Sequence, residues 1–400
     1  MYFDGVNPTD VTAYAYSVEF SRGRAQEFDE INAGVCRIGL RNHSGTFTPY
    51  DVIAAGTAIL DESEDALLTE HDLEILDESS SVFASNILPG KRVRVSVGGT
   101  VVFDGVIDDW NFAYAPDGRA DAQIEAVDAL AELAAKRFSA FTATAEQRAG
   151  ERITAFLARS EVAYGGSTNF DRGVDRLQGN AIANGRNVLT EIQLISRTDR
   201  GAFFASRVGV LTYVDRHSAA VATSSIDFAD DGSGTPFHGI TPDFGREFLY
   251  TRVTVEREGG TVQVADNSSG SDYGVRTLAL EGLLLLTDGY AANLAEFMAD
   301  TYSLPRTRVR GLIVNLDDLS SGQRSAVVGL ELADMVTVTW TPEGTSAETT
   351  QELVVEGIRH SKSYDGAYIV ELQLSQRVQS GVFTLDSATL GVLDEDALAY

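Results

Sequence analysis

Residues 89–110 (PGKRVRVSVGGTVVFDGVIDDW) place two β-type stretches on either side of a Gly-Gly pair. In the first stretch apolar and polar side chains alternate, with Val93, Val95 and Val97 on one side and Arg92, Arg94 and Ser96 on the other. This period of two is typical of a strand with one buried face. Gly98 and Gly99 can adopt the positive φ angles that a two-residue hairpin turn requires. The sequence therefore predicts a hairpin whose apolar face needs a partner sheet.

A second pattern of this kind lies near the other end of the chain. Residues 334–340 (DMVTVTW) repeat the alternation, and residues 354–358 (VVEGI) parallel residues 102–106 (VFDGV). Both copies then pass through an Asp-Gly turn, at 117–118 and 365–366, into a further alternating strand at 122–126 and 368–372. We interpret the two copies as related β-domains. Chance similarity between two β-meanders is the alternative.

Between and beside these copies the apolar pattern changes to a helical period. Asn187 is suited to cap a helix with an apolar stripe, and a further helix is predicted at 288–302 and ended by Pro305. The stripe of the first helix contains Val188, Ile192 and Ile195, and that of the second contains Tyr290, Leu294, Phe297 and Thr301. The region at about 135–245 is therefore predicted to be α+β.

The predicted fold class is mainly β with an α+β insert, in which two related β-barrel-like tube domains flank a smaller α+β domain. The predicted boundaries are 1–134 for the first β-domain, 135–245 for the α+β domain, 246–380 for the second β-domain and 381–400 for an extended C-terminal tail. An acidic insert at about 54–86 interrupts the first β-domain. A chain of 400 residues is long enough for two or three domains.

The formal net charge of the chain is −28. Such an excess of carboxylates repels phosphate backbones, which argues against a nucleic-acid-binding role. No segment approaches the ~18 continuous apolar residues of a membrane span, so we expect a soluble chain. The single cysteine, Cys36, cannot form an internal disulfide or a Cys-based metal cluster, and it is predicted to be a small core residue.

No pattern of residues indicates catalysis. The five histidines lack the i, i+4 spacing of a helical metal site, and neither a phosphate-binding loop nor a nucleophile elbow is present. Asp227, Asp231 and Gly232 resemble part of a calcium loop that lacks its closing glutamate, so a turn is the better interpretation. Asp215 and Arg216 form either a functional ion pair or a structural salt bridge, which we favour. We therefore predict no catalytic, cofactor-binding or metal-binding residues.

Several short motifs follow one another along nearly the whole chain. They occupy residues 42–50 (NHSGTFTPY), 89–95, 103–110 (FDGVIDDW), 209–216 (GVLTYVDR), 273–276 (YGVR), 302–305 (YSLP) and 383–394. In this order they resemble the minor tail proteins of siphovirus-like tailed viruses, the baseplate or tail-tip hub family. The residues taken as its signature are Gly45, Phe47, Pro49, Tyr50, Pro89, Gly90, Gly105, Asp108, Trp110, Gly209, Asp215, Arg216, Pro305 and Gly357. The acidic insert departs from the short link that the family has between Tyr50 and Pro89.

The resemblance implies a structural protein of the virion, at the tail tip, assembled in the host cytoplasm. In such hubs two similar β-domains per chain form a ring of six in a homotrimer, which joins the six-fold tail tube to a three-fold tip around a channel for genome ejection. The implied partners are a distal tail or tail-tube protein above, tip, spike or receptor-binding proteins below, and the end of the tape-measure protein. DNA would only pass through the channel, and no membrane span is expected.

Two other classes of function stay open. A tail-associated adhesin that binds glycans would present clustered exposed aromatic residues, whereas Trp110 and Trp340 occupy comparable strand-end positions in the two copies and are predicted to be core. A hydrolase of cell-surface glycans would need a catalytic domain, and none is left once the hub regions are assigned.

Overall fold

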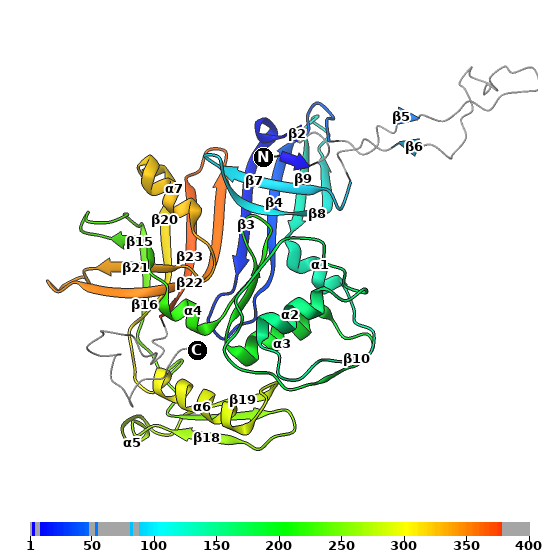
Figure 1. Ribbon diagram of the computed structural model, residues 1–400. Helices are drawn as coiled ribbons and strands as arrows, with labels where there is room; N and C mark the ends of the chain where they lie inside the picture. The colour runs from blue at the N-terminus through cyan, green and yellow to red at the C-terminus, as the bar shows by residue number, and fades with distance from the viewer. Residues whose placement is uncertain (1, 5–8, 48–52, 55–80, 83–87, 378–400) are drawn as a thin grey trace, which may run out of the picture.

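The computed structural model describes residues 2–4, 9–47, 53–54, 81–82 and 88–377 of the chain (Figure 1). A sheet of 13 strands runs through this part of the molecule. Its main path follows the order β16-β20-β23-β22-β3-β4-β9-β8-β7-β1-β2, and β21 with β15 branches from β22. The described strands therefore form an open path, and no closed barrel is present among them. The predicted mainly β class with an α+β insert is confirmed.

The N-terminal half of the sheet is built from five long strands in the order β3-β4-β9-β8-β7. These strands and the short ones beside them are β1 (Tyr2–Asp4), β2 (Thr9–Asp10), β3 (Ala15–Gly23), β4 (Asn32–Arg41), β7 (Arg92–Val97), β8 (Thr100–Tyr114) and β9 (Ala120–Val127). The predicted hairpin is β7 and β8, and its inward valines Val93 and Val95 are almost completely buried. We name these strands the first β unit.

The C-terminal half repeats this order as β16-β20-β23-β22-β21. Its strands are β15 (Ser224–Ala229), β16 (Gly239–Asp243), β20 (Arg308–Asn315), β21 (Met335–Trp340), β22 (Thr349–Ser363) and β23 (Tyr368–Gln376). Helix α7 (Ser321–Gly329), which begins with a capping box at Ser320, and a short 3-10 helix (Leu316–Asp318) connect β20 to β21. We name these strands the second β unit; five of them match five of the first unit in order and direction, as the predicted repeat requires.

A shared β-bulge gives the residue correspondence between the two units. One extra residue on the long strand, Asp108 in β8 and Glu356 in β22, interrupts the pairing with β9 and with β23. Aligned on this bulge, Ile107 corresponds to Val355 and Trp110 to Ile358. The predicted match of 102–106 with 354–358 is thus wrong by four residues, because it aligned two Asp/Glu-Gly pairs that lie at different distances from the bulge.

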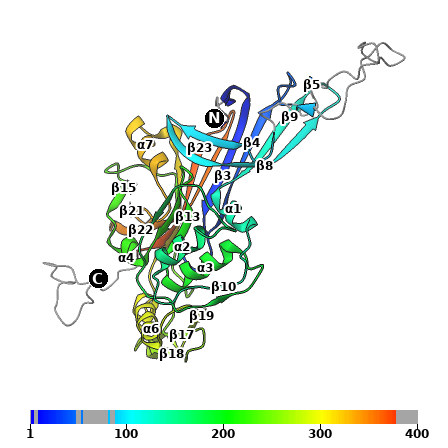
Figure 2. The ribbon, with the colours of Figure 1, turned by 45° about the vertical axis from the view of Figure 1, so that its right-hand side comes forward.

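The two units meet where β3 of the first pairs with β22 of the second. The antiparallel pairing runs from Gly23 opposite Gly357 to Ser17 opposite Ser363. In Figures 1 and 2 the long strands of both units lie side by side on either side of this seam. The two copies, over three hundred residues apart in sequence at this point, therefore form one continuous sheet.

The middle region packs helices and short strands against the first β unit. Its elements are α1 (Ala129–Ala135), β10 (Phe141–Thr142), α2 (Ala149–Leu157), β11 (Thr168–Phe170), β12 (Ala181–Ile182), α3 (Val188–Asp199), β13 (Ala202–Ala205), β14 (Leu211–Val214) and α4 (Arg216–Val221). The Asn187 side chain accepts a hydrogen bond from the Thr190 N–H, and Val188, Ile192 and Ile195 are buried, as predicted. One apolar core spans this region and both β units.

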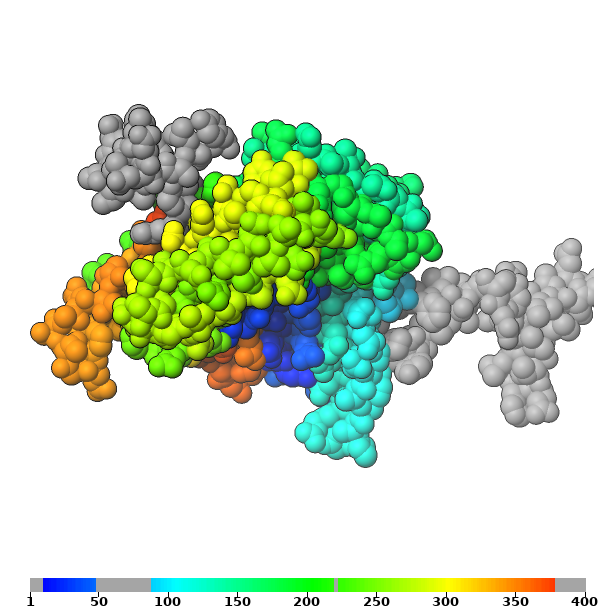
Figure 3. Space-filling model, turned by 90° about the horizontal axis from the view of Figure 1, so that it is seen from below, coloured from blue at the N-terminus to red at the C-terminus, as the bar shows by residue number. Residues whose placement is uncertain are grey.

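A smaller unit, residues 248–302, has a core of its own. It contains the sheet β18-β17-β19, made of β17 (Arg252–Arg257), β18 (Gln263–Asp266) and β19 (Thr277–Leu283), with α5 (Gly270–Tyr273) and α6 (Asp288–Tyr302). It lies at the opposite end of the molecule from the β7–β8 hairpin (Figures 1 and 2), and Figure 3 shows it in yellow and yellow-green across the centre of the lower face. The domain boundaries expected from the sequence stay predictions.

Several local predictions need correction. Helix α6 has the predicted bounds, but its buried face is Ala291, Leu294, Ala295, Met298, Ala299 and Tyr302. The β17–β19 sheet packs on that side, so the predicted stripe was rotated. Residues 11–20 are rich in β-branched and aromatic side chains, which predicts a strand over the whole stretch, but residues 12–14 form a 3-10 turn and β3 begins only at Ala15. Trp340 ends β21, whereas Trp110 lies within β8, so the two tryptophans are not equivalent.

The acidic insert is closed at its base by a short antiparallel pairing. Strand β5 (Ile53–Ala54) pairs with β6 (Ser81–Val82). The rest of the insert, residues 55–80 and 83–87, lies outside the described part of the chain. The acidic character of this segment is known from the sequence alone.

Candidate functional site

The Asp215-Arg216 pair lies where the middle region faces α6, and its two members have different tasks. The Asp215 carboxylate caps α4 and accepts hydrogen bonds from the N–H groups of His217 and Ser218. The Arg216 guanidinium is almost buried and donates to Asp175 Oδ2 at 2.9 Å and to the Asp199 carbonyl at 3.0 Å. The structural salt bridge favoured by the sequence is therefore present, but it joins Arg216 to Asp175 and not to Asp215.

Asp199 is the buried centre of this cluster. Its carboxylate accepts hydrogen bonds from the Tyr213 hydroxyl at 2.5 Å and from the backbone N–H of Asp175 at 2.9 Å. Burial raises the pKa of Asp199 to about 6, although Arg216 and these donors oppose the shift. The cluster fixes α3, β14 and the loop before β12 relative to one another.

A second ionic joint lies on the seam between the β units. The Arg24 Nε donates to Glu356 Oε2 at 2.6 Å, and Ser375 Oγ donates to Glu356 Oε1 at 2.6 Å. The side chains of Arg24 and Glu356 are only 16% and 7% exposed, so this is a well-shielded pair. Glu356 is the bulge residue of β22, and the bulge turns its carboxylate toward the end of β3.

Signature residue Gly357 allows the two chains of the seam to approach at this point. A Cβ atom at Gly357 would lie 2.6 Å from the carbonyl oxygen of Arg24. Its partner across the seam, Gly23, has a φ of +93°, in a region that favours glycine. Both positions therefore require glycine for a steric reason, and only one of them was identified from sequence.

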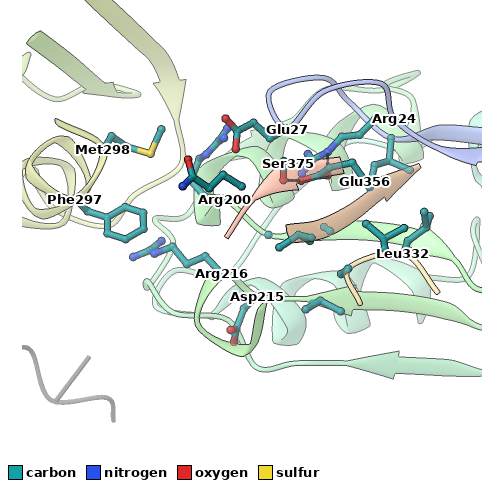
Figure 4. Close-up of a pocket in the computed structure, with 18 of the residues that line it drawn as sticks. Arg24, Glu27, Arg200, Asp215, Arg216, Phe297, Met298, Leu332, Glu356 and Ser375 are labelled. Atoms are coloured by element: carbon teal, nitrogen blue, oxygen red, sulfur yellow. Dashed lines mark hydrogen bonds and ion pairs between the residues drawn. The ribbon is translucent and has the colours of Figure 1, made fainter. Parts of the chain in front are cut away.

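A cavity of about 90 Å³ opens beside this joint (Figure 4). Its wall combines charged side chains from several segments with apolar ones from α6 and β22. The principal lining residues are Arg24, Glu27, Arg200, Arg216, Phe297, Met298, Val355 and Glu356. Burial, and then the charge of Glu356, raises the pKa of Glu27 to about 7. This cavity is the place where the seam, the middle region and the 248–302 unit meet.

Signature residues Gly105 and Gly209 meet at a third joint, around Asp104. The buried Asp104 carboxylate accepts hydrogen bonds from Arg92 at 2.8 and 2.9 Å and from Arg94 at 2.7 Å. Gly209 has a φ of +79°, and a Cβ there would lie 3.0 Å from Asp104 Oδ1. A Cβ on Gly105 would collide with the Val127 carbonyl. The loop before β14 thus rests on the first hairpin.

The remaining described signature residues shape the outer end of the first β unit. Phe47 is buried, stacks on Trp110 with ring centres 6.2 Å apart and meets Tyr14 edge-on. Gly45, with a φ of +72°, forms the turn before Phe47, and the N–H of Gly90 donates to the Ile107 carbonyl. At the same end of the first β unit, Pro89 lies in a turn, Asp108 is exposed at the bulge and Trp110 is half-buried.

Three predicted positions and two classes of site complete the account. Pro305 follows the end of α6, as predicted, while Pro49 and Tyr50 lie outside the described residues. Within the described residues, no group of three or more His, Cys, Asp or Glu side chains is placed to hold a metal ion, and no helix there has the length and apolarity to cross a membrane.

The residues that sequence reasoning missed are the partners in these joints. Arg24 and Glu331 form no local motif, because their contacts span more than three hundred residues of sequence. Asp104 lies inside the 103–110 motif, but its pairing with Arg92 and Arg94 was not predicted. Glu331 receives Arg22 Nη1 at 2.5 Å across 309 positions. Glu356 lies inside the predicted repeat, and the Glu-Gly pair at 356–357 was the one signal available in the sequence.

The whole described chain has the fold of known phage tail proteins. The 43 kDa tail protein of prophage MuSo2 from Shewanella oneidensis superposes with a TM-score of 0.58 at 14% identity, over 94% of this chain and 98% of that one. A tail protein from Neisseria meningitidis MC58 gives 0.58 at 10% identity, over 93% and 94% of the two chains. Prophage tail protein gp18 from Listeria monocytogenes gives 0.51 at 11% identity, over 92% and 91%.

Comparisons of the sequence alone found no match. No protein-family model matches the sequence, and no curated protein matches it. The predicted likeness to tail proteins of tailed viruses is therefore confirmed as a likeness of fold. The narrower siphovirus assignment stays a prediction.

Proposed function

We propose that the protein is the structural hub of a tailed-virus tail tip, a homotrimeric ring that joins the six-fold tail tube to a three-fold tip. The observation that carries this proposal is the repeat itself. Two units with the same strand order lie side by side in one chain, joined by β3 and β22. Three such chains supply six equivalent units, so a trimer can present pseudo-six-fold symmetry to a tube.

The two ends of the repeat support ring closure between copies. Beyond Ile107, no described strand pairs with the outer edge of β8, although the equivalent edge of β22 holds β3. At the other end, β16 corresponds to β3 and pairs only with β20 among the described strands. Among the described strands, each chain therefore has one vacant edge, on β8, and one strand with a vacant second edge, β16, which corresponds to the strand that fills this position at the seam. Such edges favour pairing with a second copy.

The internal seam also predicts the register of the contact. At the seam Ser361 lies opposite Glu19. When the two units are aligned on the shared bulge, Ser361 of β22 corresponds to Ala113 of β8. When the pairing of β3 with β4 is compared with that of β16 with β20, Glu19 corresponds to Thr241. In the ring, Ala113 of one copy therefore faces Thr241 of the next. Pro242 lacks an N–H and follows directly, so this pairing is short.

The remaining parts of the proposal follow the resemblance and the charge. The hub is non-enzymatic, lies in the virion at the tail tip, binds a distal tail or tube protein on one side and tip, spike or receptor-binding proteins on the other, and surrounds the path of the genome. A net charge of −28 suits a channel wall that repels DNA during passage.

Cysteine cross-linking tests the ring. The variant with Ala113→Cys and Thr241→Cys should form disulfide-linked species of up to three chains on mild oxidation, read on a non-reducing gel. Cys36 is buried and does not interfere. The pair Ala113→Cys with Ser233→Cys, an exposed turn position, is the matched control and should stay largely uncross-linked. Equal cross-linking of both pairs, or none in a chain that is trimeric, would contradict the register.

A further inference from the structure

The acid at the shared β-bulge has an arginine partner in one β unit only. At the seam, Glu356 of β22 accepts a hydrogen bond from Arg24, which directly follows β3, and the Glu356 side chain is only 7% exposed (Figure 4). The corresponding residue of β8 is Asp108. Its side chain is exposed and has no hydrogen bond or ion pair with another described residue. The first β unit therefore presents an acid at the position where the second has a completed ion pair.

The segment after β16 repeats the segment that supplies Arg24. The register that matches β16 to β3 places residues 245–246 at residues 23–24, and both pairs are Gly-Arg. In both segments Glu-Phe follows shortly afterwards, at 27–28 and at 247–248. The register was derived from strand pairing and not from this likeness of sequence, so the two observations support each other. Arg246 is therefore the counterpart of Arg24.

Arg246 is also unpaired in the single chain. Its side chain is exposed and forms no hydrogen bond or ion pair with another described residue. Two positions before it, Phe244 is 69% exposed, which makes it the most exposed large apolar side chain of the described part of the chain. Arginine and aromatic side chains are enriched where proteins bind one another. An exposed arginine beside an exposed phenylalanine is thus suited to a protein partner.

The seam indicates what Phe244 would contact. Arg22 of β3 lies opposite Ile358 of β22, and both side chains are buried. By the same correspondence, Phe244 of one copy lies opposite Trp110 of the next. Trp110 is half-buried, so part of its ring is accessible to a second aromatic side chain.

We propose that neighbouring copies of the chain are held together by a contact that repeats the seam, with Arg246 of one copy on the Asp108 carboxylate of the next and Phe244 against Trp110. Side chains make this contact, so it extends past Pro242, where the backbone pairing ends. The inference rests on the proposed ring and adds the residues that hold it. The partner is a second copy of this chain, because the acid and the arginine belong to opposite ends of the repeat.

Reversal of the two charges tests the ion pair. Light scattering at one fixed salt concentration measures the protein concentration at which half of the chain is trimeric. Asp108→Arg and Arg246→Asp should each raise this concentration by about tenfold, because each places like charges together. The double variant should return it to the value of the parent chain. Glu296→Arg, the same change at an exposed position of α6, is the matched control and should leave it unchanged.

The net charge of the chain does not explain this pattern. Asp108→Arg makes the chain less negative, which reduces self-repulsion, and the double variant has the net charge of the parent. Recovery in the double variant would therefore report the contact itself. Trimers that withstand both single reversals, or that fail to recover in the double variant, would overturn the contact and leave the ring standing. A parent chain that does not associate would count against the ring itself.

A second substitution tests the aromatic part of the contact. Phe244→Ser should raise the same concentration, because the ring is no longer buried against Trp110. Val275→Ser, at another exposed apolar position (64%), is the control and should have no effect. Both side chains are exposed in the single chain, so neither change should alter the unfolding temperature of the monomer. Equal effects of the two substitutions would overturn the assignment of Phe244.

Discussion

Joints between arginines and a buried acid connect segments of the chain, two of them distant in sequence and one across the first hairpin. Arg216 meets Asp175 and Asp199, Arg24 meets Glu356, and Arg92 and Arg94 meet Asp104. A guanidinium offers several donors in a planar fork, so one side chain can bridge two segments. Breaking such a joint leaves an uncompensated charge in a place that water reaches poorly.

Arg216→Gln should therefore be strongly destabilising. Loss of the cation leaves Asp175 and Asp199 close together and buried, and the expected cost is about 3–5 kcal/mol of unfolding free energy. Urea unfolding followed by circular dichroism measures it. Arg172→Gln is the matched control: its pair with Glu151 is exposed, 68% and 44% for the two side chains, and its loss should cost about 0–1 kcal/mol. Similar costs for both variants would contradict a buried joint.

Glu27 should make the stability of the protein depend on pH. Its pKa is about 7 in the folded chain against 4.5 for the free group, so between these values the folded state binds more protons than the unfolded state. Stability from this group therefore falls as the pH rises from 4.5 and is fully lost above 7.

Glu27→Gln should remove that dependence. At pH 8 the variant should be more stable than the parent chain, by on the order of 1–3 kcal/mol, and at pH 5 the difference should shrink. Thermal unfolding at both pH values measures it, with Glu30→Gln, the same change at an exposed neighbour, as control. A variant that is less stable at pH 8 would show that an ionised Glu27 is needed by Arg200.

At the scale of elements, the seam depends on a close approach between β3 and β22. Gly357→Ala places a methyl group 2.6 Å from the Arg24 carbonyl, so strands must separate, at about 1–3 kcal/mol. Gly311→Ala in β20 is the matched control, since its nearest neighbour would be 3.7 Å away, and it should be neutral or slightly stabilising. Denaturant unfolding compares the two. A neutral Gly357→Ala would mean that the seam can relax.

The long strands β8 and β22 explain how one chain can branch its sheet. Each has 15 residues. On the outer side, the first half of β22 pairs with β21 and the second half with β3, whereas the first half of β8 pairs with β7 and no described strand pairs with its second half. The bulge near the middle bends the strand and increases its twist, so the two halves diverge. The same device in both units places the vacant edge of β8 where β22 holds β3.

At the scale of the whole molecule, the purified chain should associate into trimers. The net charge of −28 opposes association, so light scattering should report more trimer at high salt than at low salt, where repulsion is less screened. Three-fold rings in negative-stain images would support the hub. A chain that stays monomeric at every salt and protein concentration would mean that a ring forms only when partner proteins are present, and this result would favour the adhesin.

The alternating strands, the two hairpins with their order, and the capped helices were predictable from the sequence. These features depend on side-chain period and turn chemistry within ten or twenty residues, as Val93 and Val95 or Asn187 demonstrate. The likeness in fold to tail proteins was also predictable, from the order of short motifs along the chain.

The tertiary structure alone decided how the copies correspond and what joins them. The bulges at Asp108 and Glu356 depend on pairing with β9 and β23, and a count of residues does not reveal them. The sheet beside α6 determines which face of this helix is buried. Arg24 and Glu331 acquire their partners only when distant segments meet, because ion pairs and cavities are set by distances in space and not by spacing along the chain.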